Sequence, residues 1–539
     1  KKKKKDIQEN IINVFNSIYK KIDNLDIIYN CINCGFKKEL KPNTTLFSES
    51  TNKLLKNEDS EKINILKSFD STYPRTRNYI CQNKNCKNHQ KNYEKNREAI
   101  FFVGIGGIGM SGLAQYFLLQ GHHVAGYDRV LTPLTEKLSS LGAQITNVDA
   151  STAIPVLFRD PKNVRVIYTP AIPESSHLLT YFKDNGFRLA KRAAVIGEIS
   201  HTMPCLAVAG THGKTTTSAL LTHLLRSCGK KITAFLGGIA TNIDSNFLLE
   251  GNDFMVVEAD EFDRSFMHLK PRAIALTSMD ADHLDIYGNA NELSKTFNDF
   301  AQKVSAEKRF IANGLGVEGN TFGIEAGTHR VHNLRITDGS YVFDFVTPTL
   351  RISNVPLPYL GEHNVMNAAA ALALALEAGC EPEQLKAGLA TFKGVDRRFS
   401  IRLTAPKVVV DDYAHHPTEI NAVADALEAF YPDQIKLGVF QPHLFSRTRD
   451  FITEFKQALA RFDEVLLLDI YPARELPMEG ITSALLVDES HAATQLIDKQ
   501  MLAEMIAKSA ATVVAIMGAG DIAFEVPAVM QILKNQQDA

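Results

Sequence analysis

The chain has 539 residues, which is enough for about three or four domains of ordinary size. Hydrophobic residues make up 45% of it and charged residues 22%, a balance typical of globular proteins that fold in water. No apolar run reaches the roughly 18 residues that a membrane span needs, so we expect no membrane segment. Seven cysteines without a dense framework exclude a disulfide scaffold and favour a reducing compartment, the cytoplasm.

The formal net charge of −2 hides a sharp division along the chain. Residues 1–100 carry 21 Lys and Arg against 12 Asp and Glu, whereas the remainder carries 38 against 49. The same hundred residues contain a single glycine, Gly35, and no alanine before Ala99. So abrupt a change predicts a domain boundary at about residues 99–101, between two sequences of unrelated origin joined in a fusion or chimera.

The basic segment contains two cysteine pairs, Cys31 with Cys34 and Cys81 with Cys86. Paired thiolates at such spacing are what a zinc ribbon uses to bind a tetrahedral metal ion. The segment resembles a truncated zinc-ribbon subunit of DNA-directed RNA polymerase in its viral form. The stretches that carry the resemblance are Tyr29–Gly35, Tyr73–Arg75, Ile80–Cys81 and Asn96–Phe102. Because half of each ribbon is missing, a shared Zn²⁺ and unoccupied half-sites both stay open.

Contact with nucleic acid or RNA polymerase is conceivable only for residues 1–99, where Lys1–Lys5 form a basic tail. A solvated tail without a partner is the alternative. The zinc content of the purified protein would test the hypothesis of a transcription-associated module.

From residue 100 onward, short apolar runs alternate with helical patterns, which is typical of parallel sheets with crossover helices. The first predicted strand is Phe101–Val103, and a helix follows it through Leu119. Further strands are expected at His123–Asp128, Leu206–Ala209, Phe254–Glu258, Ala273–Leu276, Val408–Val410, Leu437–Phe440, Val465–Leu468 and Val513–Met517. We therefore predict an α/β fold. Three Rossmann-like or P-loop domains with parallel sheets would span residues 100–200, 201–398 and 399–539, after the basic, zinc-ribbon-like segment 1–99.

A glycine-rich turn, Gly104-Ile105-Gly106-Gly107-Ile108-Gly109, follows the first predicted strand, and Asp128 ends the second. In a Rossmann unit such glycines let backbone amides and a helix N-terminus approach a diphosphate, while the acid receives ribose hydroxyls. The pattern alone would suggest a nicotinamide dehydrogenase. A tight turn without any ligand is the other alternative.

A second loop, Gly210-Thr211-His212-Gly213-Lys214-Thr215-Thr216, follows a strand and opens a helix. Backbone amides in such a loop surround phosphate oxygens, Lys214 offers its charge to the terminal phosphates, and the Thr215 hydroxyl can bind Mg²⁺. The spacing departs from the common P-loop, since one glycine stands three residues before Gly213 rather than five. This loop predicts ATP binding.

Two acidic motifs follow later predicted strands: Glu258-Ala259-Asp260-Glu261 and Asp280-Ala281-Asp282-His283. Carboxylate oxygens at strand ends are where nucleotide enzymes bind magnesium, which keeps several waters besides. Glu258 and His283 are therefore candidate Mg²⁺ ligands together with Thr215.

Three further motifs with candidate binding residues occur later in the chain: Gly361–Asn367, Asp411–Pro417 and Gln441–Arg449. Asn and His before an alanine-rich helix can contact a nucleobase or simply cap that helix. The two arginines of the third motif could bind carboxylates or phosphates in pairs.

In this order along the chain, the two glycine loops and the five motifs after them resemble those of the Mur ligases of bacterial cell-wall synthesis. The resemblance runs from about Ile100 to the C-terminus and includes Thr169–Pro173 and Phe392–Phe399. It implies an enzyme that uses ATP and Mg²⁺ to join L-alanine to the lactyl carboxylate of UDP-N-acetylmuramate, through an acyl phosphate, in peptidoglycan precursor synthesis. The three domains would bind the UDP-sugar, ATP and the amino acid respectively.

The resemblance also implies roles for individual residues. The UDP-sugar would contact Gly104, Gly106, Gly107, Ile108, Gly109, Asp128, Thr169, Pro170 and Ala171. ATP would contact Gly210, Thr211, His212, Gly213, Lys214, Thr215, Thr216, His363, Asn364, Asn367 and Asp412. The amino acid would contact Tyr413, His415, His443 and Arg447, and the catalytic set would be Lys214, Glu258, His283, His415 and Arg447. The base for the incoming ammonium would be His415 or His443.

One position departs from the family. Such ligases commonly have Arg-Tyr after the histidine of Gln441-Pro442-His443, and this chain has Leu444-Phe445. If that arginine binds the alanine carboxylate elsewhere, Arg447 or Arg449 must suffice here.

Two rival functions stay open. A recycling ligase that attaches a whole tripeptide to the same sugar shares the phosphate loop, but typically has Phe where Tyr413 stands. An NAD-dependent oxidoreductase would explain the glycine turn at Gly104–Gly109 but not the ATP loop.

Overall fold

The computed structural model describes two short N-terminal strands and residues 97–280, 287, 289–473, 475–487 and 494–538. The chain forms two compact units, Lys1–Glu98 and Ala99–Ala539. In the first unit, β1 (Ile27–Asn30) pairs antiparallel with β2 (Lys37–Leu40). The lysine tail and the zinc ribbon predicted from Cys31, Cys34, Cys81 and Cys86 lie outside the described residues.

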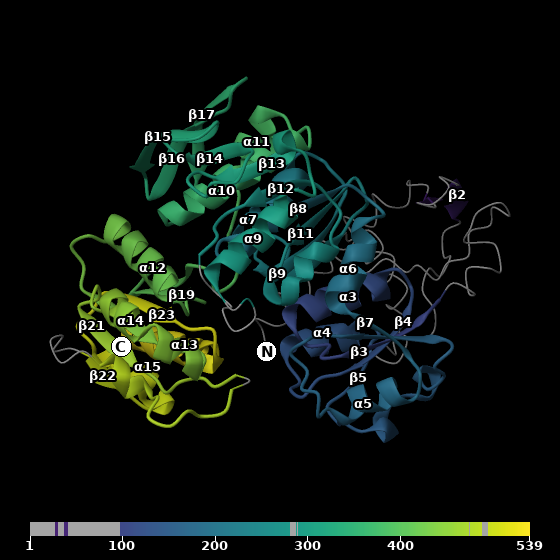
Figure 1. Ribbon diagram of the computed structural model, residues 1–539. Coiled ribbons are helices and arrows are strands. Elements are labelled where there is room, and N and C mark those ends of the chain that lie inside the picture. The colour runs from purple at the N-terminus through teal and green to yellow at the C-terminus, as the bar shows by residue number, and fades with distance from the viewer. Residues whose placement is uncertain are drawn as a thin grey trace, which may run out of the picture. The chain divides into compact units, whose positions relative to one another are not determined.

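The second unit begins with a five-stranded parallel sheet, ordered β5-β4-β3-β6-β7 (Figure 1). Its strands are β3 (Ala99–Val103), β4 (His123–Tyr127), β5 (Gln144–Thr146), β6 (Val164–Tyr168) and β7 (Arg188–Lys191), and its helices are α3 (Ile108–Leu119), α4 (Pro133–Ser140), α5 (His177–Asp184) and α6 (Arg192–Ser200). Both faces of β3 are covered: Phe102 shares one core with α3, and Phe101 packs against Phe182 of α5. A strand buried on both sides is apolar at every position, as Ala99–Val103 is.

A ten-stranded sheet forms the middle of the unit, in the order β10-β9-β11-β8-β12-β13-β14-β15-β16-β17. Its strands are β8 (Cys205–Ala209), β9 (Ile232–Ala240), β10 (Ser245–Leu249), β11 (Phe254–Glu258), β12 (Pro271–Leu276), β13 (Arg309–Ala312), β14 (Asn320–Ile324), β15 (His329–Thr337), β16 (Ser340–Val346) and β17 (Arg351–Leu357). The predicted parallel arrangement covers only part of it, because β10, β16 and β17 pair antiparallel. The turn between β15 and β16 places Asp338 and Gly339 at positive φ, as a tight hairpin requires.

Helices α7 (Lys214–Ser227), α9 (Ala290–Ala301), α10 (Glu362–Glu377) and α11 (Pro382–Leu389) accompany this sheet. The predicted buried helix at Ala368–Glu377 is the main part of α10, in which residues 368–375 are almost completely buried. Small alanine side chains let α10 pack closely beside α7 in the same core. The two helices thereby bring their first turns together.

The last sheet has the order β18-β19-β23-β20-β21-β22, and only β18 runs antiparallel to its neighbour. Its strands are β18 (Ser400–Leu403), β19 (Val408–Asp412), β20 (Lys436–Phe440), β21 (Glu464–Leu467), β22 (Thr494–Leu496) and β23 (Val513–Met517). The helices are α12 (Pro417–Phe430), α13 (Phe445–Asp450), α14 (Ile452–Leu459), α15 (Leu502–Lys508) and α16 (Val526–Asp538). Separate apolar cores on its two faces explain why all five residues of β19, β20 and β23 are buried.

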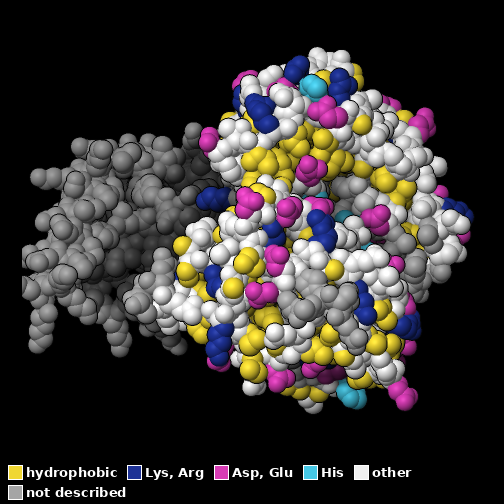
Figure 2. All heavy atoms as spheres, turned by 90° about the vertical axis from the view of Figure 1, so that its left-hand side faces the viewer, with side chains coloured by type: hydrophobic (Ala, Val, Ile, Leu, Met, Phe, Trp, Pro, Cys, Tyr) yellow, Lys and Arg dark blue, Asp and Glu magenta, His cyan; other side chains and the backbone are white. Residues whose placement is uncertain are grey.

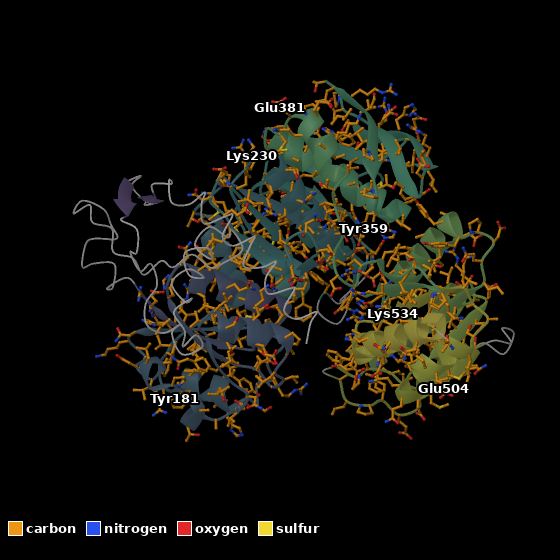
Figure 3. All side chains as sticks on the ribbon, turned by 180° about the vertical axis from the view of Figure 1, so that it is seen from behind. Tyr181, Lys230, Tyr359, Glu381, Glu504 and Lys534 are labelled. Atoms are coloured by element: carbon orange, nitrogen blue, oxygen red, sulfur yellow. The ribbon has the colours of Figure 1, made fainter. Side chains whose placement is uncertain are left out.

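The three sheets are joined by specific side chains. Helix α3 packs on β9 and β10, where Tyr116 contacts Phe235 and Phe247. Beyond the middle sheet, the Tyr359 hydroxyl donates to the Arg398 carbonyl at the start of the last sheet (Figure 3). On the face shown in Figure 2, acidic and basic side chains are interspersed among hydrophobic ones. Among the described residues, no helix is long and apolar enough to cross a membrane.

A buried aromatic cluster supports the turn after β11. Phe266 is 1% exposed and stacks on Phe300 with 4.6 Å between ring centroids. We expect Phe266→Ala to lower the thermal unfolding temperature clearly, because such a truncation costs about 3–5 kcal/mol. Phe524→Ala, at a ring that is 74% exposed, is the matched control and should change it little. Equal effects of the two substitutions would contradict this account of the core.

Candidate active site

The predicted phosphate loop joins the buried strand β8 to helix α7, which begins at Lys214. Gly210 and Gly213 have φ values of +132° and +82°, which residues with side chains rarely adopt. A Cβ atom at Gly210 would lie 2.2 Å from Thr277 Oγ1, and one at Gly213 would lie 2.4 Å from Asn367 Oδ1. Both positions therefore require glycine, because the loop lies directly against the end of β12 and the first turns of α10.

Side chains that follow β12 hold the loop in place. Ser278 Oγ accepts a hydrogen bond from the His212 amide at 2.8 Å and contacts the Thr211 hydroxyl at 2.9 Å. That threonine oxygen also accepts the Asp280 amide at 3.0 Å. The loop is thus ordered by its neighbours before any phosphate contacts it.

Lys214, the predicted phosphate-binding cation, points back along the loop. Its Nζ donates to the Gly210 carbonyl at 2.6 Å and pairs with the buried carboxylate of Glu261 at 2.8 Å. Burial alone would lower the pKa of Lys214, but Glu261, Glu258 and Asp260 raise it. The loop therefore has a positive charge at the place where terminal phosphates would bind.

Two of the three predicted magnesium ligands, Thr215 and Glu258, meet at one side of the loop. Thr215 Oγ1 donates to Glu258 Oε2 at 2.9 Å, and the Gly237 amide donates to the same oxygen at 2.9 Å. A hydroxyl and a carboxylate beside a phosphate loop are oxygen donors of the kind that Mg²⁺ prefers. The third candidate, His283, lies outside the described residues, and among the described ones no cluster of three His, Cys, Asp or Glu side chains could bind a metal ion.

A cavity of about 280 Å³ opens beside the loop. It is lined by the predicted ATP contacts His212, Gly213, Thr215, Thr216, His363, Asn364, Asn367 and Asp412, and also by Phe322, Met366, Arg398, Glu419 and Val423. Asn367 donates to Asn364 Oδ1 at 3.1 Å and accepts the Thr217 hydroxyl at 3.1 Å. Burial lowers the pKa of His363 to about 4, so this ring is uncharged. The apolar side chains and the uncharged His363, Asn364 and Asn367 suit a nucleobase, while Arg398, Asp412 and Glu419 add charge to the lining.

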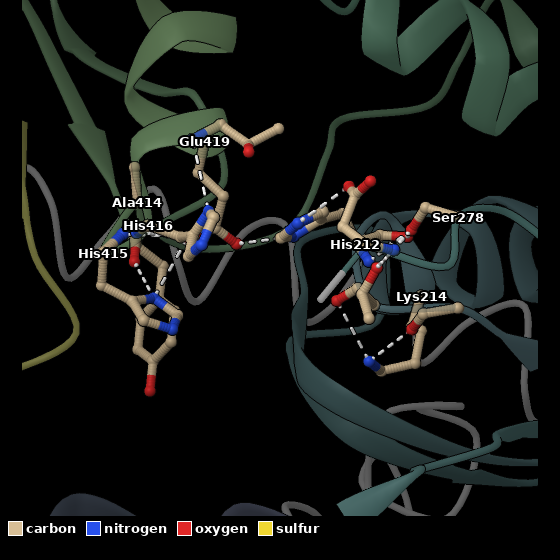
Figure 4. A network of polar contacts seen from close by, with 12 residues as sticks. His212, Lys214, Ser278, Ala414, His415, His416 and Glu419 are labelled. Atoms are coloured by element: carbon tan, nitrogen blue, oxygen red, sulfur yellow. Dashed lines mark hydrogen bonds and ion pairs between the residues drawn. The ribbon is translucent and has the colours of Figure 1, made fainter. Parts of the chain in front are cut away.

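His212 connects the phosphate loop to the last domain (Figure 4). Its Nε2 lies 3.3 Å from Asp280 and its Nδ1 lies 3.6 Å from Glu419 of α12. Burial would lower the pKa of His212, but the two carboxylates raise it to about 9. The imidazole is therefore a cation at neutral pH, and it bridges two domains.

Asp412, a predicted ATP contact, ends β19, and two of the predicted amino-acid contacts, Tyr413 and His415, lie between it and α12. Asp412 accepts the amides of Phe399 at 2.6 Å and Ala414 at 2.7 Å, and burial raises its pKa to about 6. Both carboxylate oxygens are thus used to shape the domain junction. The Tyr413 ring lies beneath the guanidinium groups of Arg397 and Arg398, with 5.1 and 5.0 Å to its centroid.

Three predicted residues of the last domain come together. The rings of His415 and His443 are 5.7 Å apart, and Arg447 Nη1 lies 3.5 Å from His443 Nδ1. Arg447 is buried, whereas Arg449 is exposed and pairs with Asp450. Of the two arginines considered for carboxylate binding, only Arg447 therefore faces the histidines.

Leu444, the departure from the family pattern, is buried and has an unusual backbone conformation. Its φ is +72°, its amide donates to the Tyr471 carbonyl at 3.0 Å, and its carbonyl accepts the Thr448 hydroxyl at 2.8 Å. A side chain at such a φ costs about 1–3 kcal/mol, which the surrounding structure must offset. This strained residue sets the turn between His443 and the start of α13.

The predicted UDP-sugar turn precedes α3. The Gly106 amide donates to Asp128 Oδ2 at 2.7 Å, and a Cβ at Gly104 would lie 3.1 Å from Thr169 Cγ2. Ile108 and Gly109 begin the helix, while Gly107, Pro170 and Ala171 are exposed around the turn. The structure therefore brings these predicted residues to one edge of the first sheet.

A second cavity, of about 180 Å³, connects this turn with the phosphate-loop region. Its walls include Gly109, Gly237, Glu258 and Asp260. Arg192 lies across it: its guanidinium packs on Gly109 and donates to Asp260 Oδ2 at 2.8 Å. The glycine turn before α3 and Glu258 thus line the same cavity.

Several residues with clear contacts were given no role from the sequence. They are Arg192, Glu261, Ser278, Asp280 as a partner of His212, Arg398 and Glu419. For Glu419 a signal was present. His416 caps α12, Pro417 opens it, and Glu419 reaches back to the cap amide, which is the capping-box pattern. The pattern predicts a helix start, but not the His212 contact from another domain.

Comparison with known proteins gives a consistent result. Three family models match in chain order: the Mur ligase catalytic domain at residues 99–203, the Mur ligase middle domain at 208–375 and the Mur ligase glutamate ligase domain at 397–520. A UDP-N-acetylmuramate–L-alanine ligase of Christiangramia forsetii is 50% identical over 441 residues, or 81% of this chain and 98% of the relative. The chain belongs to the Mur ligase family. Membership of a ligase family excludes the alternative of an NAD-dependent oxidoreductase.

Further relatives agree with this assignment. The enzyme of the same name from Flavobacterium psychrophilum is 49% identical, over 78% of this chain and 95% of the relative. The crystal structure of UDP-N-acetylmuramate–alanine ligase from Thermotoga maritima matches with a TM-score of 0.71 at 27% identity, covering 82% of this chain and all of that one. A murein peptide ligase from Psychrobacter arcticus, at 20% identity and a TM-score of 0.61, shares the fold.

The His212 bridge should make stability depend on pH. Because its pKa is raised from 6.5 to about 9, the bridge stabilises the fold fully below about pH 6.5 and loses this contribution as the pH rises through about 9. We expect the unfolding temperature of His212→Gln to lie below that of the parent protein at pH 6.5, with the difference shrinking by pH 10. Substitution of the exposed His177 by Gln is the control. A difference that does not change with pH would contradict a charged His212.

Proposed function

We propose that this Mur ligase joins L-alanine to the lactyl carboxylate of UDP-N-acetylmuramate at the expense of ATP, in peptidoglycan precursor synthesis. The observation that carries the proposal is the convergence on one loop of Lys214, of the Thr215–Glu258 pair and of the cavity beside α10 and α12. The curated relatives at 49–50% identity have this activity in their names. We assign residues 1–99, 100–200, 201–398 and 399–539 as the basic segment and the sugar-, ATP- and amino-acid-binding domains.

The ATP site is proposed on the phosphate loop. Gly210–Thr216 would enclose the phosphates, with Lys214 as their cation, and His363, Asn364 and Asn367 would lie beside the adenine. Mg²⁺, on Thr215, Glu258 and His283, would supply charge to the phosphates. Asp412 would also contact ATP, since it lines the same cavity and each of its oxygens accepts only one amide.

The sugar nucleotide is proposed at the turn Gly104–Gly109, with Asp128 and Thr169–Ala171 beside it. The cavity at Gly109, Arg192 and Glu258 gives the lactyl carboxylate a path toward the phosphate loop. A transferring phosphoryl group needs positioned cations more than it needs a covalent partner. Lys214 meets that need, and packing of the last domain over the site would keep water from the acyl phosphate.

The amino acid is proposed beside Tyr413, His415, His443 and Arg447. Arg447 would receive the alanine carboxylate, because it is the buried arginine of its pair. A cytoplasmic location is part of the proposal, and the proposed use of ATP and a sugar nucleotide supports it. A zinc ion on the four N-terminal cysteines, and any contact of residues 1–99 with nucleic acid or RNA polymerase, stay predictions from the sequence.

Phosphate release from ATP tests the proposed function. We expect release that requires both UDP-N-acetylmuramate and an amino acid, fastest with L-alanine and slower with serine or glycine. Lys214→Ala should reduce it by at least about 10³-fold, the scale of removing a cation from a transferring phosphoryl group. Lys534→Ala, at an exposed lysine of α16, is the control (Figure 3).

Two outcomes would overturn the proposal. Equal phosphate release without the sugar nucleotide would exclude this acceptor. Faster release with the alanyl-glutamyl tripeptide than with alanine would identify the recycling ligase instead.

A further inference from the structure

The proton on His415 can be placed from its contacts. His415 Nδ1 lies 2.9 Å from the Tyr413 carbonyl oxygen and 3.2 Å from Glu419 Oε2. A carbonyl and a carboxylate only accept hydrogen bonds, so Nδ1 must carry the hydrogen. In the neutral ring, Nε2 therefore has its lone pair available to take a proton.

The surroundings keep this ring neutral near pH 7. Burial lowers the pKa of His415, and the nearby guanidinium groups of Arg447 and Arg398 act in the same direction, while the Glu419 carboxylate opposes them. The rings of Tyr413 and His443 pack against it from the other sides. An uncharged imidazole with Nε2 unprotonated is the form that a general base needs.

His443, the other candidate base, has the opposite arrangement. Its Nδ1 faces the Arg447 guanidinium at 3.5 Å, and a guanidinium only donates. The neutral His443 ring therefore carries its hydrogen on Nε2, and its face stacks on Tyr471. Such a ring can donate to a substrate oxygen but does not offer Nε2 as a base.

Glu419 is positioned by contacts from three segments. Its Oε2 accepts the amides of His415 at 2.9 Å and His416 at 3.2 Å, at the start of α12. Its Oε1 lies 3.6 Å from His212 of the phosphate loop and 3.8 Å from Arg398 of the domain junction. Figure 4 shows Glu419 between the His212 ring and the His415–His416 pair. One carboxylate thus contacts both the loop proposed for ATP and the residue proposed for the amine.

We propose that Glu419 is a positioning residue that holds His415 with Nε2 ready to deprotonate the incoming amino acid, and that its ion pair with His212 links this geometry to contact between the last domain and the phosphate loop. The inference rests on the proposed function and names the base of that reaction.

The proton transfers balance as follows. The alanine ammonium gives one proton to His415 Nε2, and the imidazolium that forms is stabilised by Glu419. The freed nitrogen lone pair forms the C–N bond at the acyl phosphate carbon, and the C–O bond to phosphate then breaks. The second proton of the attacking nitrogen leaves with the departing phosphate, which gives the amide.

Hydroxylamine separates this step from the rest of the reaction. It is a neutral nucleophile near pH 7, so it can trap the acyl phosphate as a hydroxamate without a base. Each variant is measured for alanine-dependent turnover and for hydroxamate formation from ATP and UDP-N-acetylmuramate. We expect the ratio of the first rate to the second to fall about 10²-fold in His415→Gln and about tenfold in Glu419→Gln. Glu419→Gln should also move the acidic limb of kcat/KM for alanine to lower pH, because His415 loses the carboxylate that raises its pKa.

Glu428→Gln is the matched control, since it makes the same change at an exposed position of the same helix. The inference is overturned if Glu419→Gln leaves alanine turnover and its pH profile unchanged, or if hydroxamate formation and alanine turnover fall by the same factor in His415→Gln. Absence of hydroxamate with the parent protein would instead count against the proposed acyl phosphate, and hence against the function itself.

Discussion

The phosphate loop depends on the absence of two side chains. At Gly210 and Gly213 the backbone lies so close to Thr277 and Asn367 that a single methyl group would overlap them. This closeness lets strands β8 and β12 and helices α7 and α10 contribute to one small region. Lys214, Thr215 and the cavity beside them are all placed by it, and the last domain contacts the loop through His212.

Charged groups make several of the contacts between domains. Arg192 of the first domain pairs with Asp260 of the middle one, and His212 of the middle domain pairs with Glu419 of the last. A charge that is partly buried is costly unless its partner is present. Contacts of this kind therefore favour one relative placement, yet they can separate with less loss of apolar burial than a shared hydrophobic core would require. Such a balance suits a ligase whose substrates must enter between its domains.

Nine of the strands and the positions of both glycine loops could be predicted from the sequence, because each depends on neighbours in sequence. Strands β3 and β8 are apolar at every position, and the two glycine loops follow them directly. The strands β5–β7, β9, β10, β13, β14, β18 and β22 were missed. The strands β15–β17 were missed as well, since their alternation is interrupted by bulges. The partners of Lys214 and His212 could not be predicted, because Glu261 and Glu419 come from segments whose approach is fixed only by tertiary packing.

The alanines of α10 have an effect beyond filling the core. Residues 368–375 set how near this helix lies to α7, and Asn367 stands one residue before them, against Gly213. The volume of these side chains therefore sets the distance between Asn367 and the phosphate loop. A methylene group added deep in the middle domain, far from any ligand, would move Asn367 relative to the loop. Selection for ATP affinity would then also constrain the side-chain volumes of residues that do not contact ATP.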